Sequence, residues 1–129
     1  DSDVHEMNWI DRMSGTEFEE YISFFFNKRG YMTQLTKQSH DFGGDIIVSG
    51  GLIRSIVQCK RSQDKISVSA VQQVYAASKV YQTERALVVT NNRFTSHAEI
   101  LASIVGVELW DRRRLRLELI KNSTITCNI

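Results

Sequence analysis

The sequence predicts an α/β fold, with a central mixed β-sheet flanked by helices in the order αβββαβαβα. Three observations predict it. A capped amphipathic helix opens the chain, a glycine turn joins two short strands, and the second half alternates helices with apolar strands. A hairpin followed by crossover connections produces a sheet with both strand directions and helices on both faces.

The first helix is expected over residues 15–29. Ser14, followed three residues later by Glu17, forms a capping box that satisfies two backbone donors at the helix start. Gly30 then favours the left-handed conformation that ends many helices. Apolar side chains recur at the spacing of one helix face: Phe18, Tyr21, Ile22, Phe25 and Phe26.

Three strands are expected next. Residues 31–37 are rich in strand-forming side chains, and residues 40–44 form a loop. Residues 45–48 and 52–60 are the second and third strands, joined by a turn at residues 49–51. Because this turn is so short, the two strands must pair as an antiparallel hairpin.

Helices and strands alternate in the second half. Ser67 is expected to cap a helix that runs to about Gln82, and Thr95 to cap another. Between them, residues 86–90 form a continuous apolar strand of the buried, parallel kind. The remaining elements are a final strand and a final helix, at residues 107–110 and 112–121.

The 129 residues are enough for one compact domain and too few for two. We expect the domain to span residues 14–121, between an N-terminal flank at 1–13 and a C-terminal tail at 122–129. Because the chain begins with Asp1 rather than Met, it is compatible with an excised part of a longer protein. Further domains, including a membrane anchor or a recognition domain, therefore stay open.

The overall charge neither requires nor excludes a nucleic-acid partner. Sixteen Lys and Arg oppose fifteen Asp and Glu, for a net charge of +1. A local basic face would suffice for nucleic acid, although each basic cluster taken alone reads equally well as solvated surface. The clusters are Lys28-Arg29, Lys60-Arg61 with Lys65, and Arg112-Arg113-Arg114 with Arg116.

Cysteine usage and hydropathy predict a cytoplasmic protein. Cys59 and Cys127 lack the spacing of metal ligands and are expected to be free thiols in a reducing compartment. The sequence shows neither a signal peptide nor an apolar run near 18 residues, so no membrane contact is expected from this segment.

The hairpin gathers three chemically useful side chains. Reflecting its strands about a turn centred near residues 50–51 brings Asp45 opposite residues 56–57, with Gln58 as a diagonal neighbour. Gln58 and Lys60 are two residues apart on one strand, so both side chains point to the same face. An acid, an amide and an amine therefore meet at one end of the hairpin.

This grouping suits phosphodiester hydrolysis with Mg²⁺, a hard cation that takes oxygen ligands and keeps several waters. Asp45 would supply a carboxylate, Gln58 its amide oxygen and Cys59 its backbone carbonyl. Lys60 would position or deprotonate the attacking water and neutralise the transition state. The plainer interpretation is a solvated strand face after a turn aspartate, and for these residues alone it is the stronger one.

Two segments resemble the catalytic domain of Mrr-type restriction endonucleases, a group within the PD-(D/E)xK nuclease superfamily: His40-Asp41-Phe42-Gly43-Gly44-Asp45-Ile46-Ile47-Val48 and Val57-Gln58-Cys59-Lys60-Arg61. The likeness extends over residues 14–119 and implies a restriction-endonuclease-like fold. It includes the helices and the fourth strand at Phe18-Glu19, Gly30-Tyr31, Val68-Ser69-Ala70-Val71-Gln72, Val89-Thr90 and Phe94-Thr95.

The resemblance implies a role for each matching residue. Asp45 would be a metal ligand, Gln58 the variant of the usual Glu, and Lys60 the catalytic lysine. Glu19 matches the first-helix acid that often completes the metal site, directly or through water; its alternative is an exposed carboxylate near a helix N-terminus. Asp41 matches the first Asp of the motif, and either supports the site or shapes the loop.

DNA would lie across the sheet edge that carries the catalytic residues. Arg61 and Lys65 add positive charge there for contacts with phosphates, which carry little sequence information. Gln72 matches a family position and either touches phosphate or faces water. A neutral Gln58 in place of Glu reduces the negative charge that holds the metal, which leaves open whether metal affinity or the number of bound metals is lower; within the Mrr-type group this substitution is usual.

The resemblance thus implies an Mg²⁺-dependent DNA endonuclease, with Mn²⁺ as a substitute, in restriction or another defence against foreign DNA. Its partner would be double-stranded DNA, and cutting both strands favours a homodimer or higher oligomer. The alternative is a catalytically silent nucleic-acid-binding or scaffold domain, against which the intact catalytic trio argues. An unrelated nucleotide-binding domain lacks support, because Gly43-Gly44 precedes a strand rather than a helix.

Overall fold

The computed structural model describes residues 2–36 and 45–127, and side chains within residues 7–36 and 45–122. The expected loop at residues 40–44, with Asp41, lies outside the described residues. The elements follow in the order α1 (Ser2–Asp11), α2 (Gly15–Lys28), β1 (Met32–Leu35), β2 (Asp45–Gly50), β3 (Ile53–Lys60), α3 (Val68–Val80), β4 (Arg85–Thr90), α4 (Ser96–Val105), β5 (Glu108–Trp110) and α5 (Arg112–Cys127).

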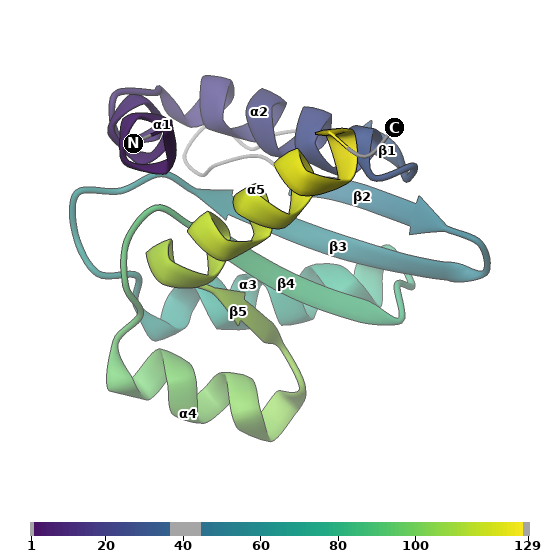
Figure 1. Cartoon of the computed structure of the whole chain (residues 1–129). Coiled ribbons are helices and arrows are strands. Elements are labelled where there is room, and N and C mark those ends of the chain that lie inside the picture. The colour runs from purple at the N-terminus through teal and green to yellow at the C-terminus, as the bar shows by residue number, and fades with distance from the viewer. Residues whose placement is uncertain (1, 37–44, 128–129) are drawn as a thin grey trace.

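Within the described residues, five strands form one sheet in the order β1-β2-β3-β4-β5. The first three strands are antiparallel to one another, whereas β4 runs parallel to β3 and β5 runs parallel to β4. Figure 1 shows α2 and α5 on one face of this sheet, with α3 and α4 on the other. The predicted mixed sheet flanked by helices is therefore confirmed.

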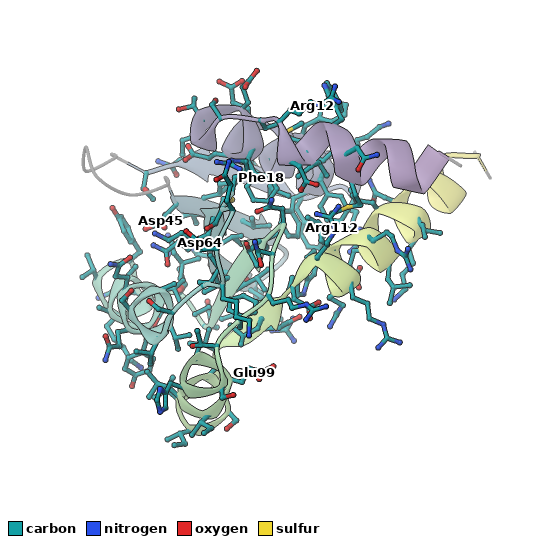
Figure 2. The ribbon with its side chains drawn as sticks, turned by 90° about the vertical axis from the view of Figure 1, so that its left-hand side faces the viewer. Arg12, Phe18, Asp45, Asp64, Glu99 and Arg112 are labelled. Atoms are coloured by element: carbon teal, nitrogen blue, oxygen red, sulfur yellow. The ribbon has the colours of Figure 1, made fainter. Side chains whose placement is uncertain are left out.

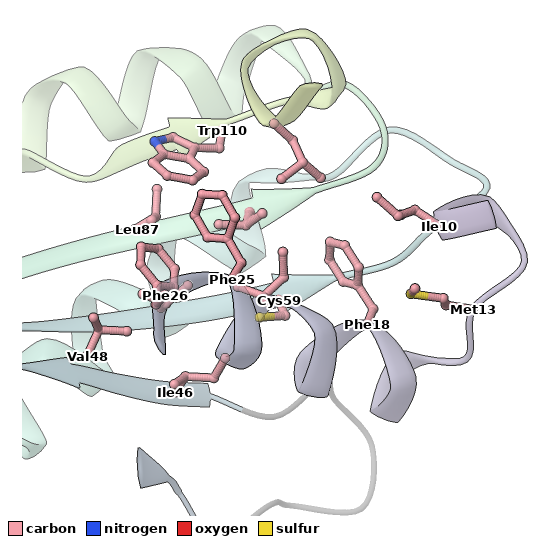
Figure 3. Packing of buried hydrophobic residues seen from close by; sticks show 14 of the residues in the cluster. Ile10, Met13, Phe18, Phe25, Phe26, Ile46, Val48, Cys59, Leu87 and Trp110 are labelled. Atoms are coloured by element: carbon pink, nitrogen blue, oxygen red, sulfur yellow. The ribbon is translucent and has the colours of Figure 1, made fainter. Parts of the chain in front are cut away.

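Each face of the sheet has its own apolar core. On the α2 side, aromatic rings of α2 pack with Trp110 and with the strand residues that face them, as Figure 3 shows. Leu115 of α5 belongs to the same core. On the other side, α3 and α4 pack over Ile47, Ile56 and Val88. Successive strand residues therefore enter opposite cores, which explains the nearly continuous apolar sequences of the central strands.

Helices extend into both of the predicted flanks. Helix α1 occupies most of the predicted N-terminal flank and buries Met7 and Ile10 in the α2-side core. Its apolar residues are interspersed with polar ones and give α1 little amphipathic character, so helical periodicity does not reveal it in the sequence. Helix α5 continues to Cys127 instead of ending at Lys121, because no glycine or proline stops it there.

The predicted helix ends are largely confirmed. Ser14 Oγ accepts from the Glu17 amide at 3.1 Å, and Glu17 Oε1 accepts from the Ser14 amide at 2.8 Å, which completes the capping box. Gly30 adopts a φ of +92° after α2. Ser67 occupies the N-cap of α3 but its side chain makes no capping bond, while Thr95 caps α4 through the Ala98 amide at 3.2 Å.

The hairpin turn lies one position later than predicted. Gly50 pairs with Ile53, so Gly51 and Leu52 form a two-residue turn. Gly51 adopts a φ of +63°, which glycine reaches without steric cost. This shift changes the register of every pair in the hairpin, including the pair at the candidate site.

Among the described residues, no helix is both long and apolar enough to cross a membrane.

Candidate active site

The candidate site lies where β2 begins and β3 ends. Asp45 pairs directly with Gln58, and Lys60 follows two residues later on the same strand face. The predicted register, with residues 56–57 opposite Asp45 and Gln58 diagonal to it, is wrong by one to two residues because the turn lies at residues 51–52. The true register brings the two side chains closer than expected, since directly opposed residues have Cβ atoms roughly 4.5–5.5 Å apart.

Two oxygens at this point are shielded from solvent and lack hydrogen bonds. Neither Asp45 Oδ1 nor Gln58 Oε1 has a hydrogen-bond partner among the described residues. A buried acceptor without a donor costs about 1–3 kcal/mol, so evolution rarely retains a pair of them without a purpose. Carboxylate and amide oxygens side by side are ligands that a hard divalent cation takes, and the pair therefore fits a metal of the Mg²⁺ type.

The nitrogen of the Gln58 amide, unlike its oxygen, has a hydrogen-bond partner. Gln58 Nε2 donates to Oε1 of Gln73 on α3 at 3.1 Å. Sequence reasoning had named the neighbouring Gln72, which is exposed on the same helix, and had missed Gln73. Residue 73 lies two residues after the buried Val71 and just before the buried Val74. The positions of these two valines could therefore have indicated residue 73 as one that faces the sheet.

The electrostatics of the site oppose ionisation of its acid. Burial raises the pKa of Asp45 to about 6, an effect that Glu19 reinforces and the Lys60 ammonium partly offsets. Burial also lowers the pKa of Lys60, with Asp45 acting against it. A carboxyl and an amine whose pKa values approach each other are typical of functional sites.

Glu19 is buried, with only 1% of its surface exposed. The alternative of an exposed helix carboxylate is therefore wrong for this residue, while its neighbours Glu17 and Glu20 are the exposed ones. Its charge contributes to the raised pKa values of Asp45 and Cys59, so it lies within electrostatic reach of both. Helix α2 thus brings a second acid to the start of β2 and the end of β3.

The Cys59 side chain points away from Asp45, Gln58 and Lys60. It lies in the α2-side core, as Figure 3 shows, and burial raises the pKa of its thiol well above the usual range. Only its backbone can therefore serve the site. Among the described residues, no group of three or more His, Cys, Asp or Glu side chains could hold a metal, so such a site would rest on mixed oxygen ligands.

The predicted DNA-contacting residues occupy different positions. Lys65 is exposed in the loop before α3, and Gln72 is exposed on α3 itself. Arg61 is half-buried, and its Nε donates to no described acceptor. It lines a cavity of about 390 Å³ at the carboxyl ends of β3 and β4, together with Asp11, Ser62, Gln63, Asn91, Asn92, Arg93 and Arg112.

An ion pair that sequence reasoning missed supports this cavity. Arg112 binds Asp11 through two hydrogen bonds of 2.7 and 3.0 Å, and Asn91 Nδ2 donates to the same carboxylate at 3.0 Å. The pair joins the end of α1, the loop after β4 and the start of α5. Asp11 lay in the predicted flank, so no sequence pattern pointed to it.

The sequence comparisons identify the family of this fold and site. Residues 10–119 match the model of the Mrr catalytic domain, described as a restriction endonuclease. The chain belongs to the restriction endonuclease family. The resemblance stated from the sequence is thereby confirmed, and members of this family are nucleases that act on DNA. No curated protein matched the sequence.

Solved structures of low sequence identity share the fold. The DNA modification-dependent restriction endonuclease AspBHI matches 98% of this chain with a TM-score of 0.67 and 15% identity, over 40% of its own length. The MspJI restriction endonuclease, solved with a 27-mer oligonucleotide, matches 91% with a TM-score of 0.57 and 18% identity, over 30% of its length. Apo EndoMS matches 73% with a TM-score of 0.57 and 16% identity, over 45% of its length. The chain thus spans less than half of each of these relatives.

Proposed function

We propose that this chain is the catalytic domain of a metal-dependent DNA endonuclease that acts in restriction or another defence against foreign DNA. The observation that carries the proposal is the pair of buried oxygens, Asp45 Oδ1 and Gln58 Oε1, left without donors beside Lys60. A silent scaffold domain would have no use for this arrangement, since filling it with apolar side chains would cost less.

The metal site would be built from side chains and backbone of β2, β3 and α2. Members of this family generally use divalent metal ions. Asp45 and Gln58 would be direct ligands with the Cys59 carbonyl, and Glu19 would complete the site directly or through water. When bound, Mg²⁺, or Mn²⁺ in its place, lowers the pKa of a water and offsets charge on the phosphate.

Lys60 would act on the water and the phosphate. Its ammonium is half-buried near Asp45, and burial lowers its pKa, so it is closer to exchanging a proton at neutral pH than a surface lysine. In the ammonium form it would neutralise charge on the phosphate oxygens, and in the amine form it would accept a proton from the attacking water.

The DNA would lie across the end of the molecule where β3 and β4 finish. Figure 2 looks onto this end, with Asp45 to one side and Arg112 to the other. Arg61, Arg93 and Lys65 would contact phosphates here, and Gln72 would do so from α3. Such contacts carry little sequence information, so we propose that target choice comes from further domains of a longer protein.

The proposed substrate is double-stranded DNA, and the acting form is a homodimer or a higher oligomer. A domain with one such site cuts one strand at a time, so two copies would cut both. We place the protein in the cytoplasm, where its target DNA is met and where the buried thiol of Cys59 stays reduced.

Cleavage of plasmid DNA tests the proposal. With Mg²⁺ or Mn²⁺ the wild-type protein should nick or linearise the plasmid, and Asp45→Ala and Lys60→Ala should each lower the rate by at least about 100-fold. Glu20→Ala on α2 and Lys79→Ala on α3 are matched controls, because both residues are exposed.

An intact plasmid with the wild-type protein, or equal cleavage by the wild type and both site variants, would contradict the nuclease. Binding of DNA without cleavage would favour the silent nucleic-acid-binding alternative instead.

A further inference from the structure

A glutamine is an asymmetric metal ligand. Its Oε1 accepts hydrogen bonds and binds cations, whereas its Nε2 carries two hydrogens and cannot bind a cation. A carboxylate at the same position has two equivalent oxygens and needs no such choice. Gln58 therefore serves a metal only if the amide is held with its oxygen toward the site.

If the Gln58 amide were turned the other way, its nitrogen would face a hydrogen-bond acceptor. Asp45 lies directly opposite, and its Oδ1 lacks a donor among the described residues. If the Gln58 amide were turned, Nε2 could donate to this carboxylate, and one hydrogen bond would satisfy a buried acid. That bond would occupy both ligands at once. The productive orientation therefore needs a contact that outweighs it.

Gln73 supplies that contact from the opposite side. Its Oε1 accepts the hydrogen bond from Gln58 Nε2 at 3.1 Å, and Gln58 itself is only 3% exposed. The flanking residues Val71 and Val74 are fully buried, so α3 holds the Gln73 backbone firmly over the sheet. A turned Gln58 would face this acceptor with its own oxygen and lose the bond as long as the Gln73 amide keeps its orientation.

We propose that Gln73 is a positioning residue, which holds the Gln58 amide so that Oε1 faces the metal site and Nε2 faces α3. The proposal rests on the proposed function, because it concerns the metal of that same site. Residues that orient a metal ligand typically change metal affinity by about 10- to 100-fold when they are lost. We therefore expect loss of the Gln73 acceptor to weaken metal binding by about 10-fold.

A double-mutant cycle on metal affinity tests this role. Mn²⁺ binding is measured by titration calorimetry on the wild type, Gln73→Met, Gln58→Glu and the double variant. Methionine keeps the length of the side chain and removes its acceptor. Gln73→Met should weaken binding by about 10-fold in the wild-type background and by less than about 3-fold beside Gln58→Glu, where both ligand oxygens are equivalent.

Equal losses in both backgrounds would overturn the proposal, because they would show that Gln73 acts through packing alone. Unchanged affinity of Gln73→Met in the wild-type background would overturn it as well. Gln73→Glu keeps an acceptor and should retain wild-type affinity or better. Gln34→Met, at an exposed position on β1, controls for the general effect of the substitution.

Nuclear magnetic resonance of the metal-free protein separates this inference from the proposed function. The Gln58 side-chain NH₂ should exchange slowly with solvent in the wild type, and its resonances should shift in Gln73→Met. If the wild type binds no Mn²⁺, the proposed function fails, and the NH₂ signals still decide the orientation. A Gln58 NH₂ that exchanges freely, or that ignores Gln73→Met, overturns the positioning role.

Discussion

At the scale of single residues, the candidate site contains groups that lower the stability of the fold. Asp45 holds a carboxylate where burial and Glu19 oppose its charge, and one of its oxygens has no donor among the described residues. Gln58 Oε1 likewise has no hydrogen-bond donor among the described residues. Such costs persist in a protein when the groups serve a purpose other than folding.

This cost predicts that Asp45→Asn stabilises the metal-free protein. The asparagine carries no charge, and its Nδ2 can donate to Gln58 Oε1. We expect the free energy of unfolding to rise by on the order of 1 kcal/mol at neutral pH, after discounting for the solvent that still reaches Asp45, which corresponds to roughly 4 °C in Tm. Thermal unfolding in the presence of a chelator measures it.

The same variant has a predicted dependence on pH. The pKa of Asp45 is raised from 3.8 to about 6 in the folded protein, so its ionisation destabilises the fold above that range. The gain from Asp45→Asn should therefore be full above about pH 6 and disappear as the pH falls toward about 4. Asp64→Asn, at an exposed loop position, should leave Tm nearly unchanged, and a lower Tm of Asp45→Asn at neutral pH would refute the argument.

At the scale of elements, one arginine joins the end of α2 to the middle of α5. Arg29 Nη2 binds Glu118 Oε1 at 2.6 Å, and its Nε donates to Asn122 at 3.0 Å. Burial opposes ionisation of Glu118, but hydrogen bonds from Arg114 and Arg29 outweigh it and lower the pKa of this carboxyl. The Arg29–Glu118 ion pair holds α5 against α2, and so supports the helix that carries Glu19.

Loss of Arg29 should therefore destabilise the fold by more than a surface ion pair does. Arg29→Met leaves Glu118 buried with fewer partners, and we expect a loss of about 2–3 kcal/mol, below the value for a fully broken pair because Arg114 remains. Urea denaturation at neutral pH measures it. Glu118→Gln in the Arg29→Met background should recover part of the loss, and Arg116→Met, exposed on α5, is the matched control. A loss no larger than that of the control would contradict this account.

At the scale of the whole molecule, the two ends of the sheet differ in character. The end where β3 and β4 finish holds Lys60, Arg61 and the polar cavity, whereas the hairpin end exposes apolar side chains such as Leu52. Ligands of open α/β sheets bind beyond the carboxyl ends of their parallel strands. The proposed site therefore lies at the end of the sheet where ligands of such folds usually bind.

This difference between the two ends of the sheet predicts which basic residues contribute to DNA affinity. Arg61→Met should weaken binding to unrelated DNA sequences alike, and should reduce the slope of log affinity against log salt by about 1. Arg85→Met, at the start of β4 and so at the opposite end of the sheet, should leave the slope unchanged. Fluorescence anisotropy with a labelled duplex in Ca²⁺ measures both. Equal slopes for the two variants would show that DNA does not lie across the proposed end.

Much of this architecture follows from local patterns in the sequence. The capping box at Ser14, the glycine after α2 and the apolar spacing of α2 each depend on residues within one element, and the structure contains them all. The family motif likewise identified Asp45, Gln58 and Lys60 as a group. These features are readable because neighbours along the chain determine hydrogen bonding and facial periodicity in helices and strands.

What only the tertiary structure decided depends on contacts between distant elements. The register that opposes Asp45 to Gln58 follows from a turn centred one residue later than the glycines suggest, which shifts the pairing partner of Asp45 by up to two residues. Burial of Glu19, the choice of Gln73 over Gln72 and the pairing of Asp11 with Arg112 each require knowing which surfaces meet. The sequence by itself determined the elements from α2 onward and the chemical groups of the candidate site. Packing decided which atoms of those groups face one another, because side-chain orientation depends on neighbours that are far away in the chain.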